Sequence, residues 1–198
     1  MYTNEQWARF IQGETFGDTY PYDTGDKQQI EMHLLRLYRQ LQRIPSLCCE
    51  AEFSHFGSGY ASFVEFFCYR KQDIILHKEK EKYGIRQVVK TGLLLNVSRL
   101  APLFIYGEDE RYETVKLATN EIISGGYSSL PGQNNINCVR DELVPLLTKV
   151  TPHLEEFGYQ LLEQQQAVAP LPLQTKIPTL YREAGQYRKL DALFYWED

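Results

Sequence analysis

The 198-residue sequence lacks a cluster of basic residues, which indicates that it does not bind nucleic acid. Lysine and arginine number 21 against 26 acidic residues, so the formal net charge is −5 at pH 7. Proteins that bind DNA or RNA usually gather basic side chains, because phosphate contacts supply most of their affinity. The densest charged run, 78–82, alternates in sign and nearly cancels. The acidic balance instead favours a basic protein partner.

The sequence also has no long apolar run. The N-terminal 15 residues lack the basic region and apolar stretch of a signal peptide. No segment approaches the roughly 20 apolar residues that span a bilayer. We therefore predict a cytoplasmic protein without a membrane partner. Its four cysteines, Cys48, Cys49, Cys68 and Cys138, form no CxxC pair and match no zinc spacing, so we expect reduced thiols.

Motifs that carry a known reaction are missing as well. The sequence contains no HExxH, no GxSxG and no glycine-rich phosphate loop of the known kinds. We interpret Gly57-Ser58-Gly59 as a turn between two strands rather than a nucleophile site. The glycine-rich segment 124–135 follows a predicted helix and is interpreted as a flexible connector. We predict a non-enzymatic protein with no cofactor and no metal.

Two arrangements of side chains are weighed against that prediction. His55 and His77 lie on neighbouring predicted strands, where Glu52 or Glu65 could complete a metal site. The thiol of Cys49 or Cys68 could pair with His55 as nucleophile and base across strands. Ordinary strand histidines and inert, core-facing thiols are the favoured interpretations.

Aromatic residues, by contrast, are abundant at 13% of the chain, enough to build a large core. In residues 47–70 apolar side chains alternate on both sides of the glycine turn, a pattern typical of a β-hairpin. The second strand is aromatic on both faces, so we predict that it is central to a sheet. Similar alternation predicts a mostly antiparallel meander over about 47–106.

Apolar residues at helical spacing predict four helical segments. Thr3 and Gln6 have the spacing of a capping box at the first helix, and Pro45 ends the second. Acidic residues 108–110 suit the N-terminus of the third. Pro152 either restarts or kinks the fourth. The predicted helices span about 4–12, 26–43, 108–124 and 137–166.

The C-terminal segment completes the predicted fold. Leu190, Ala192, Phe194 and Trp196 alternate, which predicts a last strand at about 187–196. Strands and helices each cluster along the chain, which is typical of α+β architecture. We therefore predict one α+β domain over residues 1–198, with helices mainly on one face of the sheet.

Recognition is the function class left by these observations. We expect Tyr20, Tyr22 and Tyr127 to be exposed in predicted loops, and tyrosine is favoured at interfaces. The leading hypothesis is a protein-binding protein, of the kind of a bacterial immunity or antitoxin protein, that blocks a basic partner. One alternative is a small-ligand protein or an enzyme with a pocket between sheet and helices. The other is a structural subunit of a homo-oligomer.

Overall fold

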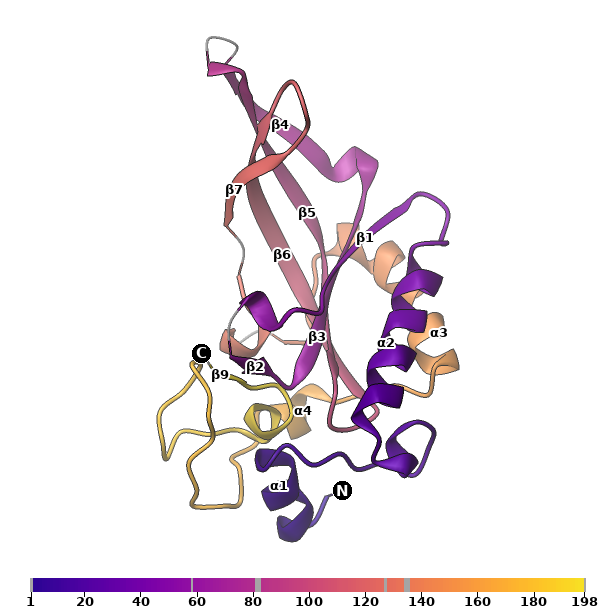
Figure 1. Cartoon of the computed structure of the whole chain (residues 1–198), viewed down its shortest axis with the longest axis vertical. Helices are drawn as coiled ribbons and strands as arrows, with labels where there is room; N and C mark the ends of the chain where they lie inside the picture. Colours follow the sequence, from indigo (N-terminus) through magenta and orange to yellow (C-terminus); the bar gives the residue numbers. More distant parts are fainter. Residues whose placement is uncertain (1, 58, 81–82, 127, 134–135, 198) are drawn as a thin grey trace.

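A computed structural model describes residues 2–57, 59–80, 83–126, 128–133 and 136–197, and it confirms the α+β class (Figure 1). The main sheet has seven strands in the order β1-β3-β5-β6-β7, with β4 on β5 and β8 on β6. The strands are β1 (Leu47–Glu52), β2 (Tyr60–Ala61), β3 (Phe63–Arg70), β4 (Ile74–Lys80), β5 (Ile85–Ser98), β6 (Leu103–Lys116), β7 (Ile122–Gly126), β8 (Gln160–Leu161) and β9 (Trp196–Glu197). The α-helices are α1 (Asn4–Ile11), α2 (Lys27–Leu41), α3 (Val144–Glu156) and α4 (Gln164–Ala167).

The predicted hairpin at 47–70 is confirmed, with a longer connection than the glycine turn alone. β1 pairs with β3 in antiparallel register from Leu47 opposite Arg70 to Glu52 opposite Glu65. β3 lies between β1 and β5, and its residues 63–69 are buried. Aromatic side chains on both of its faces therefore do mark a central strand.

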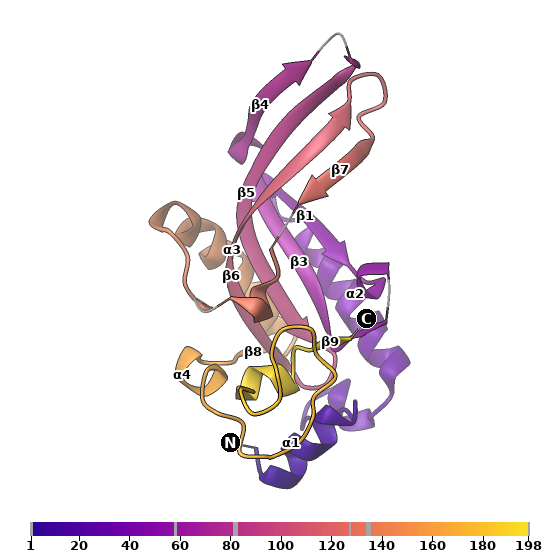
Figure 2. The ribbon, with the colours of Figure 1, turned by 90° about the vertical axis from the view of Figure 1, so that its left-hand side faces the viewer.

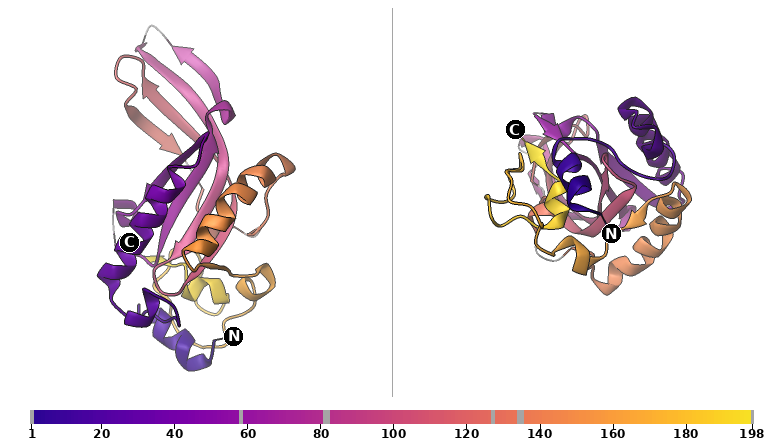
Figure 3. Two further views of the ribbon diagram at one scale, coloured as in Figure 1. Left: turned by 90° about the vertical axis from the view of Figure 1, so that its right-hand side faces the viewer. Right: turned by 90° about the horizontal axis from the view of Figure 1, so that it is seen from below.

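Helices α2 and α3 cover one side of the sheet, here called the helix face (Figure 3). Asp26 caps α2 by accepting a hydrogen bond from the Gln28 N–H at 2.8 Å. A core of fully buried side chains fills the space between helices and sheet. It includes Ile30, Leu34, Leu37, Val64, Phe66, Leu93, Leu95, Val150 and Leu154. No helix in the described part of the chain is long and apolar enough to cross a membrane.

The opposite face of the sheet is covered only in its lower half, by α1 and the C-terminal segment (Figure 2). The predicted strand at 187–196 is wrong in this segment. Residues Lys189–Ala192 form a 3-10 helix, and only Trp196–Glu197 pair with β2. The Asp191 carboxylate accepts a hydrogen bond from the Arg188 N–H at 2.6 Å, and this local cap takes precedence over the alternating pattern.

The predicted helix at 108–124 is also wrong, because β6 continues to Lys116 and β7 follows it. Asp109, Arg111 and Glu113 alternate onto one face of the sheet, where Arg111 pairs with Glu65 of β3 and Glu113 pairs with Lys90 of β5. These cross-strand partners favour a strand over a helix with an acidic first turn. Asn120, with φ of 56°, lies in the turn between the two strands.

The predicted helix at 137–166 is only partly present. α3 ends at Glu156, and Gly158 then adopts a positive φ of 83°, the backbone region that favours glycine. The Gln160 N–H donates to the Pro102 carbonyl at 2.9 Å, which draws β8 alongside β6. This pairing interrupts the helix before the short α4.

Candidate functional site

The three predicted binding tyrosines do not form one site. Tyr20 is half exposed, whereas Tyr22 is only 2% exposed, so the expectation that Tyr22 lies at the surface is wrong. The Tyr22 hydroxyl donates to the Ser98 carbonyl at 2.5 Å and lies 3.2 Å from the Tyr159 hydroxyl. Tyr127 lies outside the described residues. A role of any of these tyrosines in binding stays a prediction.

The two histidines considered above as metal ligands lie on different elements of the fold, and neither shares an element with Cys49 or Cys68. His55 accepts a hydrogen bond from the Ala61 N–H through Nδ1 at 3.0 Å, while His77 lies on β4. Cys49 and Cys68 meet on the helix face with their sulfurs 3.3 Å apart. This hydrogen bond, together with burial, raises the pKa of the Cys68 thiol well above its usual range, which disfavours the nucleophilic thiolate form. Among the described residues, no three acidic, histidine or cysteine side chains are placed to hold a metal.

The upper end of the sheet extends past both helices (Figures 1 and 3). This part, here called the distal sheet, consists of β4, β7, residues 85–90 of β5 and residues 111–116 of β6, with the turns that join them. Seven of the twelve exposed large apolar residues in the described part of the chain lie there. They are Ile74, Ile75, Leu76, Tyr83, Tyr112, Ile122 and Ile123. Ile75 and Tyr112 lie on one face of the distal sheet, whereas Ile74 and Leu76 lie on the other. Exposed apolar residues concentrated in one region indicate an interaction surface more than scattered single residues would.

The strand register shows how these side chains are arranged. Ile75 and Tyr112 both lie opposite Val89, on either side of it. Val89 has the same parity on β5 as Leu93, so this row continues the helix face beyond the ends of the helices. Below, α2 and α3 bury the apolar side chains of this face; here no helix covers them (Figure 3).

A hollow of about 300 Å³ lies within the distal sheet, lined by residues of all four strands, including His77, Tyr112 and Glu113. A pocket with a histidine and a carboxylate is one feature expected of the ligand-binding or enzymatic alternative. The hollow does not lie between sheet and helices, where that alternative placed its pocket. Glu113 is already paired there, since its carboxylate lies 2.7 Å from the Lys90 ammonium.

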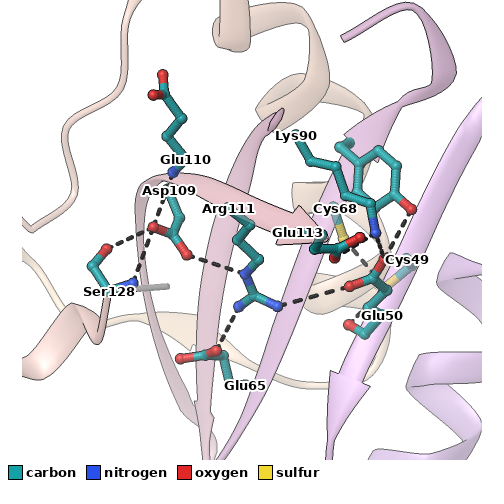
Figure 4. A network of polar contacts seen from close by, with 11 residues as sticks. Cys49, Glu50, Glu65, Cys68, Lys90, Asp109, Glu110, Arg111, Glu113 and Ser128 are labelled. Atoms are coloured by element: carbon teal, nitrogen blue, oxygen red, sulfur yellow. Dashed lines mark hydrogen bonds and ion pairs between the residues drawn. The ribbon is translucent and has the colours of Figure 1, made fainter. Parts of the chain in front are cut away.

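The opposite face of the sheet carries a network of charged side chains around Arg111 (Figure 4). We call Glu50, Glu52, Glu65, Asp109 and Glu113, with Lys90 and Arg111, the carboxylate network. The Arg111 guanidinium lies 2.6 Å from Glu65, 3.1 Å from Asp109 and 3.8 Å from Glu50. Lys90 lies 2.8 Å from Glu50. Although burial lowers the pKa of Lys90, its hydrogen bonds to Glu113 and Glu50 raise that pKa above its usual value.

Glu65 is the carboxylate of this network whose pKa is raised. Its side chain is 3% exposed, and burial raises its pKa from 4.5 to about 7, against the lowering effect of Arg111. Sequence reasoning considered Glu65 only as a metal ligand and did not find Lys90 or Arg111. The alternation of charges at 109–113 is the signal that would have revealed the network, had this segment been predicted as a strand.

Comparison of the chain with protein-family models, with curated proteins and with solved structures finds no match. Two features of the geometry therefore remain to carry a functional argument. One is the uncovered apolar surface of the distal sheet, and the other is the carboxylate network with its buried Glu65.

Proposed function

We propose that this chain is a non-enzymatic protein-binding protein that docks its partner on the distal sheet. The observation that carries the proposal is the gathering of exposed apolar side chains on β4, β6 and β7, beyond the cover of the helices. Exposed apolar surface costs free energy in water, and burying it against a partner recovers about 25 cal/mol per Å². The row of Ile75 and Tyr112 on one face, with Ile74 and Leu76 on the other, offers such surface to a partner.

The edges of the distal sheet offer a second means of attachment. β4 and β7 each pair with one strand only, within the part of the chain that the structure describes. An edge strand presents unpaired backbone groups to which an extended segment of another protein can bind. Ile74–Leu76 lie on such an edge, so backbone pairing and apolar contact would there act together.

The proposed partner is a basic protein, and the proposed class is the bacterial immunity or antitoxin type acting in the cytoplasm. The net charge of −5 supports a basic partner. The carboxylate network supports it too, because Lys90 and Arg111 are its only basic members and are shared among the acidic side chains drawn around them (Figure 4). Charge complementarity of this sort steers association and selects partners more than it adds affinity.

Substitutions on the distal sheet test this proposal. Ile75→Asp places a charge in the apolar row, and Leu180→Asp makes the same change at a matched site outside the distal sheet, 58% exposed against 61% for Ile75. Proteins captured from the native host by the wild-type chain would be identified by mass spectrometry and purified. We expect the Ile75→Asp variant to bind such a partner at least about tenfold more weakly and Leu180→Asp to bind it normally.

Three results would contradict the proposal. In the first, Ile75→Asp binds the purified partner as well as the wild type does. In the second, sedimentation shows that the distal sheet holds only another copy of the chain, which supports the homo-oligomer alternative. In the third, a small molecule co-purifies in place of a protein, which supports the ligand alternative. Inhibition of the partner's activity by the chain would support the immunity type.

A further inference from the structure

A recess of about 170 Å³ opens beside the carboxylate network, at the β1 edge of the sheet. Glu50, Glu52 and Ala51 of β1 line it, together with Glu65 of β3, Arg111 of β6 and Phe56. We call it the Glu65 recess. Cavities of about 150 Å³ are known to accept a molecule as large as benzene, so this recess has room for a group of that size.

One oxygen of Glu65 has no hydrogen-bond partner. Arg111 pairs with Oε1 at 2.6 Å, while Oε2 is buried and unpartnered among the described residues. A buried acceptor without a donor costs about 1–3 kcal/mol, and more when it is charged. Asn96 lies opposite Glu65 on β5, and its side-chain amide is likewise buried and unpartnered. Unpartnered polar atoms therefore lie on the same face of two adjacent strands at this level of the sheet.

The charges around the recess are unbalanced toward the acidic side. Arg111 is shared among Glu65, Asp109 and Glu50, and Glu52 lies directly opposite Glu65 in the register of β1 and β3. Burial raises the pKa of Glu65 most, Asp109 and Glu52 add to that rise, and Arg111 offsets only part of the total. A further cation would therefore be stabilised in this recess.

The geometry selects the kind of cation. No three carboxylates in the described residues converge closely enough to hold a metal ion, so the acceptors suit a larger group with several donors. A guanidinium is flat and carries five N–H donors in a fixed fork, which matches carboxylates bidentately. The Phe56 ring supplies an aromatic wall, on which guanidinium groups also stack. An ammonium group, a compact point charge, fits such spread acceptors less well.

We propose that the Glu65 recess binds a guanidinium group carried on an alkyl chain, with Glu65, Glu52 and Glu50 as its acceptors. The group comes either from an arginine side chain of a protein or from a small guanidinium compound. This site goes beyond the proposed function, since none of its lining residues belongs to the distal sheet except Arg111, whose side chain lies on the opposite face from the row of Ile75 and Tyr112.

Titration with L-arginine tests the site in the full-length protein. Isothermal calorimetry and NMR of the side-chain carboxyl groups would follow binding of L-arginine, of L-lysine and of L-citrulline, a neutral molecule of nearly the same shape as arginine. We expect arginine to bind and to shift the Glu65 carboxyl resonance. Lysine should bind more weakly, and citrulline should not bind detectably.

Two matched variants locate the binding. Glu65→Gln removes the acceptor charge from the recess and should weaken arginine binding at least tenfold. Asp191→Asn makes the same chemical change at another buried carboxyl group with an unpartnered oxygen, which does not line the recess. It should leave arginine affinity unchanged. Melting curves would establish that both variants are folded, and the citrulline comparison on the wild-type protein needs no variant.

The source of the guanidinium is distinguished by a second ligand. An arginine residue blocked at both termini mimics a side chain within a protein, whereas free arginine mimics a small compound. Tighter binding of the blocked residue assigns the recess to a protein partner, and tighter binding of free arginine assigns it to a small molecule. Absence of any carboxyl shift at millimolar arginine, equal binding of citrulline, or unchanged binding by Glu65→Gln would overturn the proposal.

Discussion

The aromatic ring of Phe67 packs against the backbone of Gly92 on the neighbouring strand. A β-carbon at Gly92 would lie 2.8 Å from Cε2 of that ring and 2.6 Å from the Cys68 carbonyl oxygen. On the same ring, the Arg111 guanidinium lies 4.1 Å from the centroid. The missing side chain at Gly92 thus lets Phe67 lie between β5 and Arg111, which reaches across to Glu65.

Gly92→Ala should therefore destabilise the protein by roughly 1–3 kcal/mol, because the new methyl group overlaps both backbone and ring. Urea unfolding would measure the change. Gly126→Ala is the matched control, since a β-carbon at this strand position meets nothing within 4 Å; we expect its effect to stay within about 0.5 kcal/mol. Equal stability of the two variants would show that Phe67 does not require the glycine.

Much of the sheet could be predicted because its strands carry period-2 patterns that nothing nearby contradicts. The alternation in β1 and β3 specified the hairpin, and the aromatic residues of β3 specified its central place. Residues 108–116 were mistaken for a helix because Tyr112 and Val115 also satisfy helical spacing. Pairing with β5 over 13 successive residue pairs makes this segment a strand, and such pairing cannot be predicted from the local spacing of apolar residues.

The candidate sites depended on that same information. Lys90 and Glu113 lie 23 positions apart in sequence and Arg111 and Glu65 lie 46 apart, so only the register of the strands brings them together. The apolar surface of the distal sheet was hidden for another reason. Its residues look like ordinary core residues until the lengths of the strands and helices show that the helices end first.

The role of Tyr22 can be separated from that of its neighbour in the same loop. Tyr22→Phe removes a buried hydrogen bond to the Ser98 carbonyl and should cost about 1–2 kcal/mol of stability. Tyr20→Phe, at a half-exposed residue, should change stability by less than about 0.5 kcal/mol. Thermal unfolding of both variants would measure these effects. If Tyr22→Phe had normal stability but lost partner binding, Tyr22 would have a role in recognition and not in stability.

The raised pKa of Glu65 predicts how stability depends on pH. Burial raises this pKa from 4.5 to about 7, so between these pH values the folded protein holds a proton that the unfolded chain has released. Stability from this group therefore falls as pH rises through that window and is constant above it. A difference of about 2.5 pKa units corresponds to roughly 3 kcal/mol.

Glu65→Gln removes this titration, because glutamine stays neutral and keeps a similar size. The variant should match the wild type near pH 4.5 and become more stable than it by up to about 3 kcal/mol near pH 8. Urea unfolding of both proteins across this range would measure the difference, in which the contributions of other titrating groups cancel. The stability of Asp191→Asn should differ from that of the wild type with the same sign, since burial raises the pKa of Asp191 to about 7 as well.

If Glu65 were fully stabilised as a carboxylate by Arg111, the glutamine variant would instead lose stability at pH 8, because the ion pair at 2.6 Å would be broken. The sign of the difference at high pH thus decides whether Arg111 satisfies Glu65 or leaves it able to accept another cation.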